Sequence, residues 1–284
     1  MSSIPFQHRK HWGAFAILML LTIFGSLGSN IPLAFQIFSA VLVAPYVISI
    51  PLLYRVIMEY NPGSRMRRAW VLMMWCAGFS VLRHLLDFVS SLVNVRLGMQ
   101  IRDISLVATL LSISIQLLSM ILLWSCFRGL GIQRPFTWTN RILMAIVAVF
   151  VVFCFIESSS FPHSGASSAF FRYLEFLNPV VFVASTVVGL LLYRLSEDIG
   201  ASDFGLSVLF LVLQLFARIS GFAFQTLARR LGSLPLAHVS NIFYWIYPWL
   251  FFWAILFRWQ IIGSVMRTVQ FRGETRREFI PINR

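Results

Sequence analysis

The sequence has 284 residues, of which 58% are hydrophobic and 12% are charged. A soluble domain of this length could not bury so much apolar surface, so the composition indicates a membrane protein. The net charge of +13 does not indicate nucleic-acid binding, because the basic residues lie in short loops beside apolar segments, where they set orientation and meet anionic lipid headgroups.

The apolar residues fall in separate segments of about 18 to 25 residues, the length that a helix needs to cross roughly 30 Å of hydrocarbon. We therefore predict an all-α, polytopic membrane helix bundle with about eight transmembrane helices. Turn residues such as Asn61-Pro62-Gly63 separate the segments, and no loop is long enough to form a separate catalytic domain. A single transmembrane domain is thus expected over residues 1–258. In chain order, the predicted spans are 12–29, 34–55, 70–94, 104–127, 141–158, 175–194, 205–228 and 239–258.

The first segment, 12–29, has a second interpretation. The basic stretch His8-Arg9-Lys10-His11 before it and Ser26-Leu27-Gly28 at its end resemble the flanks of a secretory signal peptide. Cleavage would leave seven spans and place the new N-terminus outside. We favour the uncleaved chain, because the site is not a clean Ala-x-Ala and the next span follows within a few residues.

The distribution of basic residues predicts that both ends of the chain lie in the cytoplasm. Positively charged loops tend to stay on the cytoplasmic side of a membrane. With the N-terminus inside, most of the 23 basic residues fall in cytoplasmic segments, among them the loops 59–69 and 128–141. Only Lys10 among them is lysine, which hints at a GC-rich genome, so we expect a prokaryotic inner (plasma) membrane. The outer side then holds only Arg96, Arg102, Arg172, Arg229 and Arg230.

Two weaker patterns concern the ends and the order of the spans. Every second span ends in an aromatic residue followed by arginine, which is typical of a helix end at the headgroup level. Spans 34–55 and 175–194 also share short blocks of sequence, which suggests two four-helix halves, 12–127 and 141–258. Chance similarity between segments built from Val, Leu and Ala is the alternative. The four span ends are Tyr54-Arg55, Phe127-Arg128, Tyr193-Arg194 and Phe257-Arg258.

Three ionisable residues, Arg83, His84 and Asp87, lie near the middle of span 70–94. An ionised side chain at that depth costs about 2.5–3.5 kcal/mol on insertion scales, so it is rarely kept without a partner or a purpose. Arg83 and Asp87 are one helical turn apart and can form an ion pair. His84 and Asp87 can form a carboxylate-oriented imidazole of the kind that a proton relay uses. A purely structural salt bridge that gives packing specificity is the alternative.

Arg218, in the middle of span 205–228, has no acidic residue within one helical turn. It must therefore contact another helix, Gln214 or a bound anion. Because Glu157 and Glu175 lie at outer span ends, Asp87 is the only acidic residue at comparable depth. Two arginines and one carboxylate would leave a positively charged cavity between the halves, which could bind an anionic ligand or a lipid headgroup. The alternative is that Arg218 reaches water through a local defect in the bilayer. The predicted ligand-binding residues are Arg83, His84, Asp87 and Arg218.

The sequence carries none of the motifs that would indicate an enzyme. It has no His-Glu-x-x-His, no Cys-x-x-Cys, no phosphate-binding glycine loop and no Gly-x-Ser-x-Gly. No span contains a lysine that could hold retinal, and only His84 is deep enough for intramembrane haem. We therefore expect no catalytic residues, no metal and no cofactor. The three cysteines lie inside apolar segments and are interpreted as small core residues: Cys76, Cys126 and Cys154.

Two further segments bear on partners. The rings of span 239–258, which include Tyr244 and Tyr247, are interpreted as lipid-facing or core surface rather than as the wall of a ligand site. Residues 259–284 are expected to form a basic cytoplasmic tail, and their apolar spacing suggests an interfacial amphipathic helix. We expect membrane lipids and a cytoplasmic protein as partners.

These observations predict a non-enzymatic sensor, receptor-like or assembly-partner protein, with a ligand face in its outer half and a partner face on its basic cytoplasmic side. The alternative is a small transporter with a midplane cationic site for an anionic substrate, in which His84 carries a proton. The inner halves of the spans offer few polar groups besides Ser80 and Gln214, which weakens the transporter interpretation.

Overall fold

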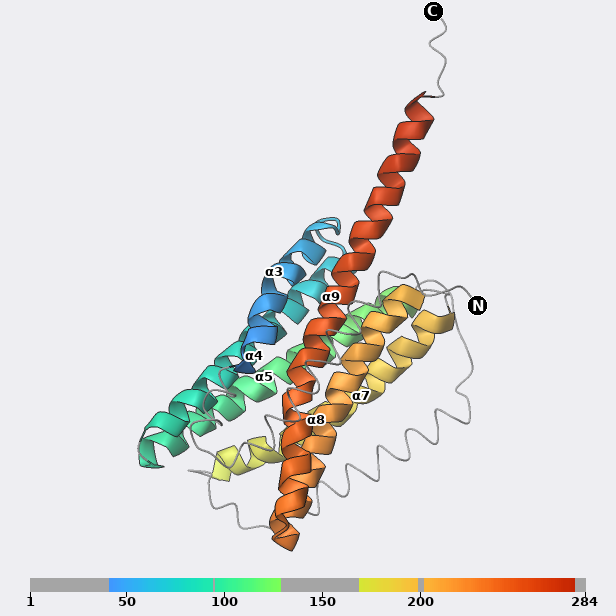
Figure 1. Cartoon of the computed structure of the whole chain (residues 1–284). Coiled ribbons are helices and arrows are strands. Elements are labelled where there is room, and N and C mark those ends of the chain that lie inside the picture. Colours follow the sequence, from blue (N-terminus) through green and yellow to red (C-terminus); the bar gives the residue numbers. More distant parts are fainter. Residues whose placement is uncertain (1–40, 94, 129–168, 199–201, 279–284) are drawn as a thin grey trace, which may run out of the picture.

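All secondary structure in the described part of the chain is α-helical. The computed structural model describes residues 41–93, 95–128, 169–198 and 202–278. Figure 1 shows the helices of these segments packed into one bundle. In chain order they are α3 (Ala44–Met58), α4 (Arg65–Leu92), α5 (Val95–Arg128), α7 (Ala169–Asp198), α8 (Ser202–Leu231) and α9 (Leu234–Glu278).

The distribution of side chains in the bundle is that of a membrane protein. Five helices, all but the shorter α3, are long and apolar enough to cross a membrane. Large apolar side chains face outward, and Trp75 and Phe216 are each 58% exposed. Polar side chains such as Ser112, Gln116 and Arg218 are buried inside the bundle. Because soluble proteins show the reverse arrangement, these features are those of a multi-pass membrane protein.

The observed helices overlap the predicted spans but are longer. The prediction followed apolar residues, whereas charged residues such as Arg65 and Arg102 continue the helices beyond the apolar core. The expected loop 95–103 is accordingly helical, since α4 ends at Leu92 and α5 already begins at Val95. Spans 12–29 and 141–158, together with the start of span 34–55, lie outside the described residues, so a total of eight is not confirmed.

The six described helices form a closed ring in chain order. Each helix packs against the helix before it and the helix after it in the order α3, α4, α5, α7, α8 and α9. The ring closes because α9 also packs against α3. The two tightest pairs are α4 with α5 and α8 with α9. A ring of this kind surrounds an interior that side chains from all six helices can reach.

A stripe of serines holds the antiparallel pair α4 and α5 together. Ser105, Ser112 and Ser119 recur every seven residues on one face of α5. The Ser105 hydroxyl donates to Asp87 Oδ1 at 2.5 Å, and the Ser119 hydroxyl donates to the Ala69 carbonyl at 2.8 Å. Between them, the Ser112 and Ser80 hydroxyls are 2.7 Å apart. Small polar residues at such an interface allow close approach and join helices by hydrogen bonds in a membrane.

A tight turn at Gly232 joins α8 to α9. Gly232 has a φ of 61°, and the N–H of Ser233 donates to the Ala228 carbonyl at 3.0 Å, which ends α8 in a Schellman arrangement. The helices then meet closely, because the Ser240 hydroxyl donates to the Gly221 carbonyl at 2.7 Å. A Cβ added at Gly221 would lie 3.3 Å from the Tyr244 ring, so this glycine permits the approach.

At the end of the bundle where α3 ends, arginines contact aromatic side chains of neighbouring helices. We call this end of the bundle the arginine end. Arg258 of α9 donates a hydrogen bond to the Tyr60 hydroxyl, and its guanidinium lies over the rings of Trp70 and Phe204 at 5.7 and 4.9 Å. Arg55 of α3 lies over another ring of α9. The arginines of two predicted aromatic–arginine span ends therefore contact neighbouring helices, and both helices continue beyond them.

Helix α9 continues past the predicted end of the last span, as far as Glu278. Figure 1 shows it leaving the bundle along its own axis at the arginine end. Most of the predicted tail 259–284 is thus helical. Its position at the membrane interface stays a prediction.

Candidate anion-binding site

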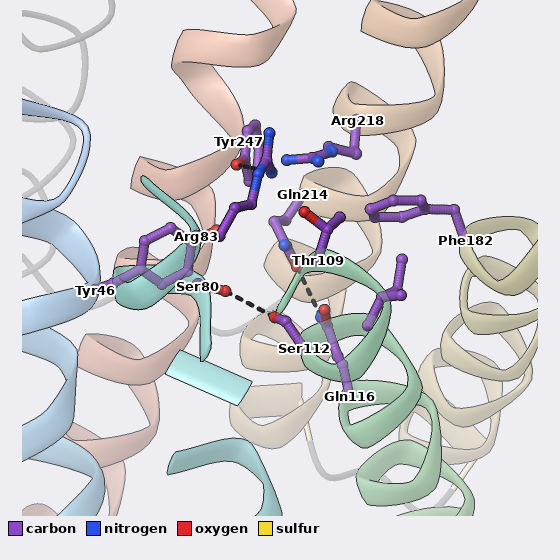
Figure 2. Close-up of a pocket in the computed structure, with 11 residues that line it drawn as sticks. Tyr46, Ser80, Arg83, Thr109, Ser112, Gln116, Phe182, Gln214, Arg218 and Tyr247 are labelled. Carbon is purple, nitrogen blue, oxygen red and sulfur yellow. Dashed lines mark hydrogen bonds between the residues drawn. The ribbon is translucent and has the colours of Figure 1, made fainter. Parts of the chain in front are cut away.

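The interior of the ring contains a polar cavity. It leaves about 20 Å³ for the centres of water molecules, which is room for one or two waters. Figure 2 shows that the side chains of Arg83 and Arg218 both point toward Tyr247 at one side of this cavity. The lining residues are Tyr46, Ser80, Arg83, Thr109, Ser112, Ile113, Gln116, Phe182, Gln214, Arg218 and Tyr247.

Arg83 of α4 is held by two partners. Its Nε lies 3.4 Å from Asp87 Oδ2, as the spacing of one helical turn predicted, and its Nη1 donates to Tyr247 Oη at 2.8 Å. Asp87 also accepts the short hydrogen bond from Ser105 of α5. Each oxygen of this carboxylate therefore has one partner within the α4–α5 pair.

His84 contacts the Tyr247 hydroxyl and is not one of the residues that line the cavity. Its Nε2 is 2.9 Å from Tyr247 Oη, and its ring stacks on Tyr46 with centroids 5.8 Å apart. The predicted contact of His84 with Asp87 is absent from the hydrogen bonds of the described residues, because Asp87 faces Arg83 and Ser105 instead. Among the described hydrogen bonds, the one to the Tyr247 hydroxyl connects His84 to the lining of the cavity.

Arg218 of α8 is buried, with 6% of its surface exposed. Its guanidinium carbon lies 4.6 Å from the ring centroid of Tyr247, 5.1 Å from that of Phe182 and 5.6 Å from that of Tyr244. No hydrogen bond or ion pair joins it to another described residue. Ring faces attract a cation by about 1–2 kcal/mol each when desolvated, but a ring face does not replace a hydrogen-bond acceptor for the N–H donors of a guanidinium.

A second cavity adjoins the first on the other side of Arg218. It leaves about 60 Å³ for water centres and shares Arg218 and Phe182 with the first cavity. The remaining lining lies farther from the arginine end, since Phe222 follows Arg218 along α8 and Pro179 precedes Phe182 along α7. Arg218 therefore lies between the two cavities. We call the first one the central cavity and the second one, which is farther from the arginine end, the outer cavity. The other lining residues are Asn178, Ile219 and Tyr244.

The bundle brings three of the four predicted site residues into direct contact with Tyr247. Arg83 and His84 hydrogen-bond to its hydroxyl, and Arg218 lies over its ring, while Asp87 contributes through Arg83. Sequence reasoning missed Tyr247 itself, because it treated the rings of the last span as lipid-facing or core surface. The hydroxyl was the available signal, since a tyrosine deep in a membrane span needs a hydrogen-bond partner.

A hydrogen bond between α5 and α8 closes the central cavity on the side that faces the arginine end. We call this bond the floor of the cavity. Gln116 Nε2 of α5 donates to Gln214 Oε1 of α8 at 2.7 Å, and these two helices are not neighbours in the ring (Figure 2). Toward the arginine end, most of the next buried side chains are apolar, among them Met120, Leu211 and Leu123, and the buried hydroxyls of Ser119 and Ser207 donate to backbone carbonyls. The Gln116–Gln214 bond therefore separates the polar cavity from a largely apolar layer.

We expect Gln116→Leu and Gln214→Leu each to lower the free energy of unfolding by about 1–3 kcal/mol, because each leaves the other amide buried without its partner. The double replacement should cost less than the sum of the two. Thermal unfolding of the four proteins in detergent measures the coupling. Strictly additive losses would show that the bond does not stabilise the fold.

The fold and the interior define a class before any particular function: a multi-pass α-helical membrane protein with a positively charged interior cavity. The sequence matches no protein-family model, and no curated protein or solved structure is significantly similar to it. Among the described residues, no three histidine, cysteine or acidic side chains come together as metal ligands would. The proposal below therefore depends on the chemistry of the cavity.

Proposed function

We propose that the chain is a non-enzymatic, receptor-like membrane protein that binds a small anion between Arg218, Arg83 and Tyr247. The observation that carries this proposal is the state of Arg218, which is buried beside two cavities, contacts three aromatic rings and has no hydrogen bond or ion pair with another described residue. A buried charge without a counterion is costly, so such a group favours binding an anion that offers acceptors to its N–H donors.

Charge and size narrow the class of ligand. Arg83 is neutralised by Asp87, so the cavity carries one net positive charge, that of Arg218. One negative charge would neutralise the site, whereas a dianion would leave an uncompensated charge in an interior of rings and amides. The volume of the two cavities is enough for a few water molecules. A small monovalent anion, such as a halide, nitrate or a short carboxylate, fits both conditions.

The apolar layer below the cavity favours a receptor over a transporter. A transporter needs a polar path to both sides of the membrane, whereas buried Met120, Leu123 and Leu211 lie between the cavity and the arginine end. The outer cavity extends in the opposite direction. We therefore propose entry from the outer side and no passage to the cytoplasm.

Eight spans and cytoplasmic ends remain part of the proposal. The α4–α5 hydrogen bonds make this pair antiparallel, so α5 ends at the arginine end, where α7 also ends. Helix α7 begins at the opposite end, and this supports the proposal of a further crossing between Arg128 and Ala169. The predicted span 141–158 supplies that crossing. A span at 12–29 would likewise start at the arginine end, which we propose faces the cytoplasm of a prokaryotic inner membrane.

The basic face at the arginine end is the proposed partner face. Arg65 and Arg68 are exposed at the start of α4, beside the α3–α4 turn. Anionic lipid headgroups and an acidic surface of a cytoplasmic protein are the chemical classes that such a face attracts. A partner of this kind would receive the signal of the proposed receptor.

Anion binding by the purified protein in detergent tests the proposal. In buffers with gluconate as the bulk anion, bromide, nitrate and acetate should raise the melting temperature of the wild type more than sulfate does. Arg218→Gln should weaken binding at least tenfold, about 1.4 kcal/mol, because it removes the charge and most of the donors. Arg218→Lys should retain part of the affinity.

The matched control is Arg102→Gln, which makes the same chemical change at an exposed position of α5. It should bind anions as the wild type does. Equal responses of the wild type and Arg218→Gln would contradict the proposed site. The structure does not describe the side chains of Glu157 and Glu175. The variants Glu157→Gln and Glu175→Gln therefore test whether either carboxylate is a native counterion of Arg218. Tighter anion binding in either variant would identify a native counterion of Arg218 and overturn the assignment of a ligand.

A further inference from the structure

The Tyr247 hydroxyl occupies a position in which the direction of its hydrogen bonds matters. It lies 2.8 Å from Arg83 Nη1 and 2.9 Å from His84 Nε2, and Tyr247 is one of the residues that line the central cavity together with Arg218. A phenol has one proton to donate and two lone pairs to accept with. Arginine can only donate, so the oxygen of Tyr247 accepts from Arg83 under all conditions.

The bond to His84 has two possible directions. When His84 Nε2 carries no proton, Tyr247 donates its only proton to that nitrogen, and no donor of Tyr247 is left for the cavity. When His84 Nε2 carries a proton, the imidazole donates to the second lone pair of Tyr247. The hydroxyl proton is then released to turn toward the cavity, where Arg218 lies over the same ring.

We propose that the cavity binds a proton on His84 together with the anion, and that Tyr247 couples the two by reversing its hydrogen bond. The inference rests on the proposed function and specifies how that site is regulated. An anion on Arg218 accepts the Tyr247 hydroxyl, which requires His84 to donate. The negative charge of the anion also offsets the cost of placing a cationic imidazole beside Arg83. By linkage, a lower pH strengthens anion binding, and anion binding draws in a proton.

The groups around His84 limit where such a proton can bind. From its own helix, Arg83 and Asp87 are nearest; α3 presents Tyr46, α9 presents Tyr247, and α8 presents Arg218 beyond the tyrosine ring. From α5, Ser105 faces Asp87. Phenols and guanidinium groups do not ordinarily titrate near neutral pH. The imidazole and the Asp87 carboxylate are therefore the two candidates, and the carboxylate already forms an ion pair with Arg83 and accepts a hydrogen bond from Ser105.

Calorimetry of bromide and nitrate binding at several pH values tests the coupling. Titrations in Tris and in bis-Tris, both as gluconate salts, differ in buffer ionisation heat and so report the protons taken up for each anion bound. For the wild type we expect uptake of up to one proton, with a Kd that rises up to tenfold per pH unit above the titration range of the site. Tyr247→Phe and His84→Gln should bind with a pH-independent Kd and without proton uptake, while Asp87→Asn should keep the uptake.

The outcomes separate this inference from the proposed function. Anion binding that depends on Arg218 but involves no proton uptake would overturn the coupling and leave the proposed function in place. It would indicate that His84 stays neutral and only moves its proton from Nδ1 to Nε2. Uptake that persists in His84→Gln and is lost in Asp87→Asn would assign the proton to the carboxylate and would likewise overturn the inference. Absence of anion binding at every pH would overturn the proposed function, and the coupling with it.

Discussion

Asp87→Ala is expected to destabilise the protein more than the double replacement of Arg83 and Asp87 by alanine. The single change leaves Arg83 without a counterion, and Arg218 already lacks one among the described residues, so two cations would face each other across Tyr247. Removing one partner of a buried pair commonly costs 3–5 kcal/mol. The Asp87 side chain is 39% exposed, which screens part of its charge, so we expect a loss of about 2–3 kcal/mol.

Thermal unfolding in detergent of the wild type, both single variants and the double variant measures this difference. Glu59→Ala is the control, because Glu59 is an exposed acidic residue near the end of α3, and it should change little. A double variant that is recovered toward the wild type identifies the pair as a structural salt bridge. A double variant whose loss equals the sum of the single losses would show that the two charges are not coupled.

Trp70→Ala is expected to have the largest effect on stability. Trp70 is 1% exposed in the core of the arginine end, and its ring lies under the Arg258 guanidinium. The replacement leaves a cavity and removes a cation–π contact between α4 and α9. Truncation of a buried aromatic side chain commonly costs about 3–5 kcal/mol, and we expect a loss in that range.

The same helix offers a matched control for this prediction. Trp75 is 58% exposed on the outer face of α4, so Trp75→Ala should leave the melting temperature within a few degrees of the wild type. Trp70→Phe should lose less than half as much as Trp70→Ala, because most of the ring volume is kept. Equal losses at Trp70 and Trp75 would mean that Trp70 is not packed in the core at the arginine end.

The sequence was sufficient to predict that the six described helices exist, though not where they end, because a membrane imposes a length and an apolar character on each span. Arg83, Asp87 and Arg218 could be singled out as candidates, since charges at membrane depth are rare. The ion pair could be predicted from helical geometry alone, because both residues lie on one helix.

The order of helices around the ring and the role of Tyr247 could not be predicted in this way. Both depend on which helix faces meet, and apolar residues on the lipid side and on the core side have the same composition. The tyrosine hydroxyl acquires its partners only when α9 packs beside α4 and α8. The seven-residue spacing of Ser105, Ser112 and Ser119 was a usable signal, since small polar residues that recur on one helix face mark a helix contact.

The last described helix, α9, is synthesised after all the others, yet it carries Tyr247 and closes the ring against α3. Until it leaves the ribosome, Arg83 and Arg218 lie in the bilayer without the ring and hydroxyl that accommodate them. Arginines at that depth are costly to leave uncovered. A nascent chain that stops before Leu234 would therefore present two marks of an unfinished membrane protein to cellular quality control. Arrival of α9 brings the Tyr247 side chain to both arginines at once, so closure of the ring of described helices and concealment of these marks are the same event.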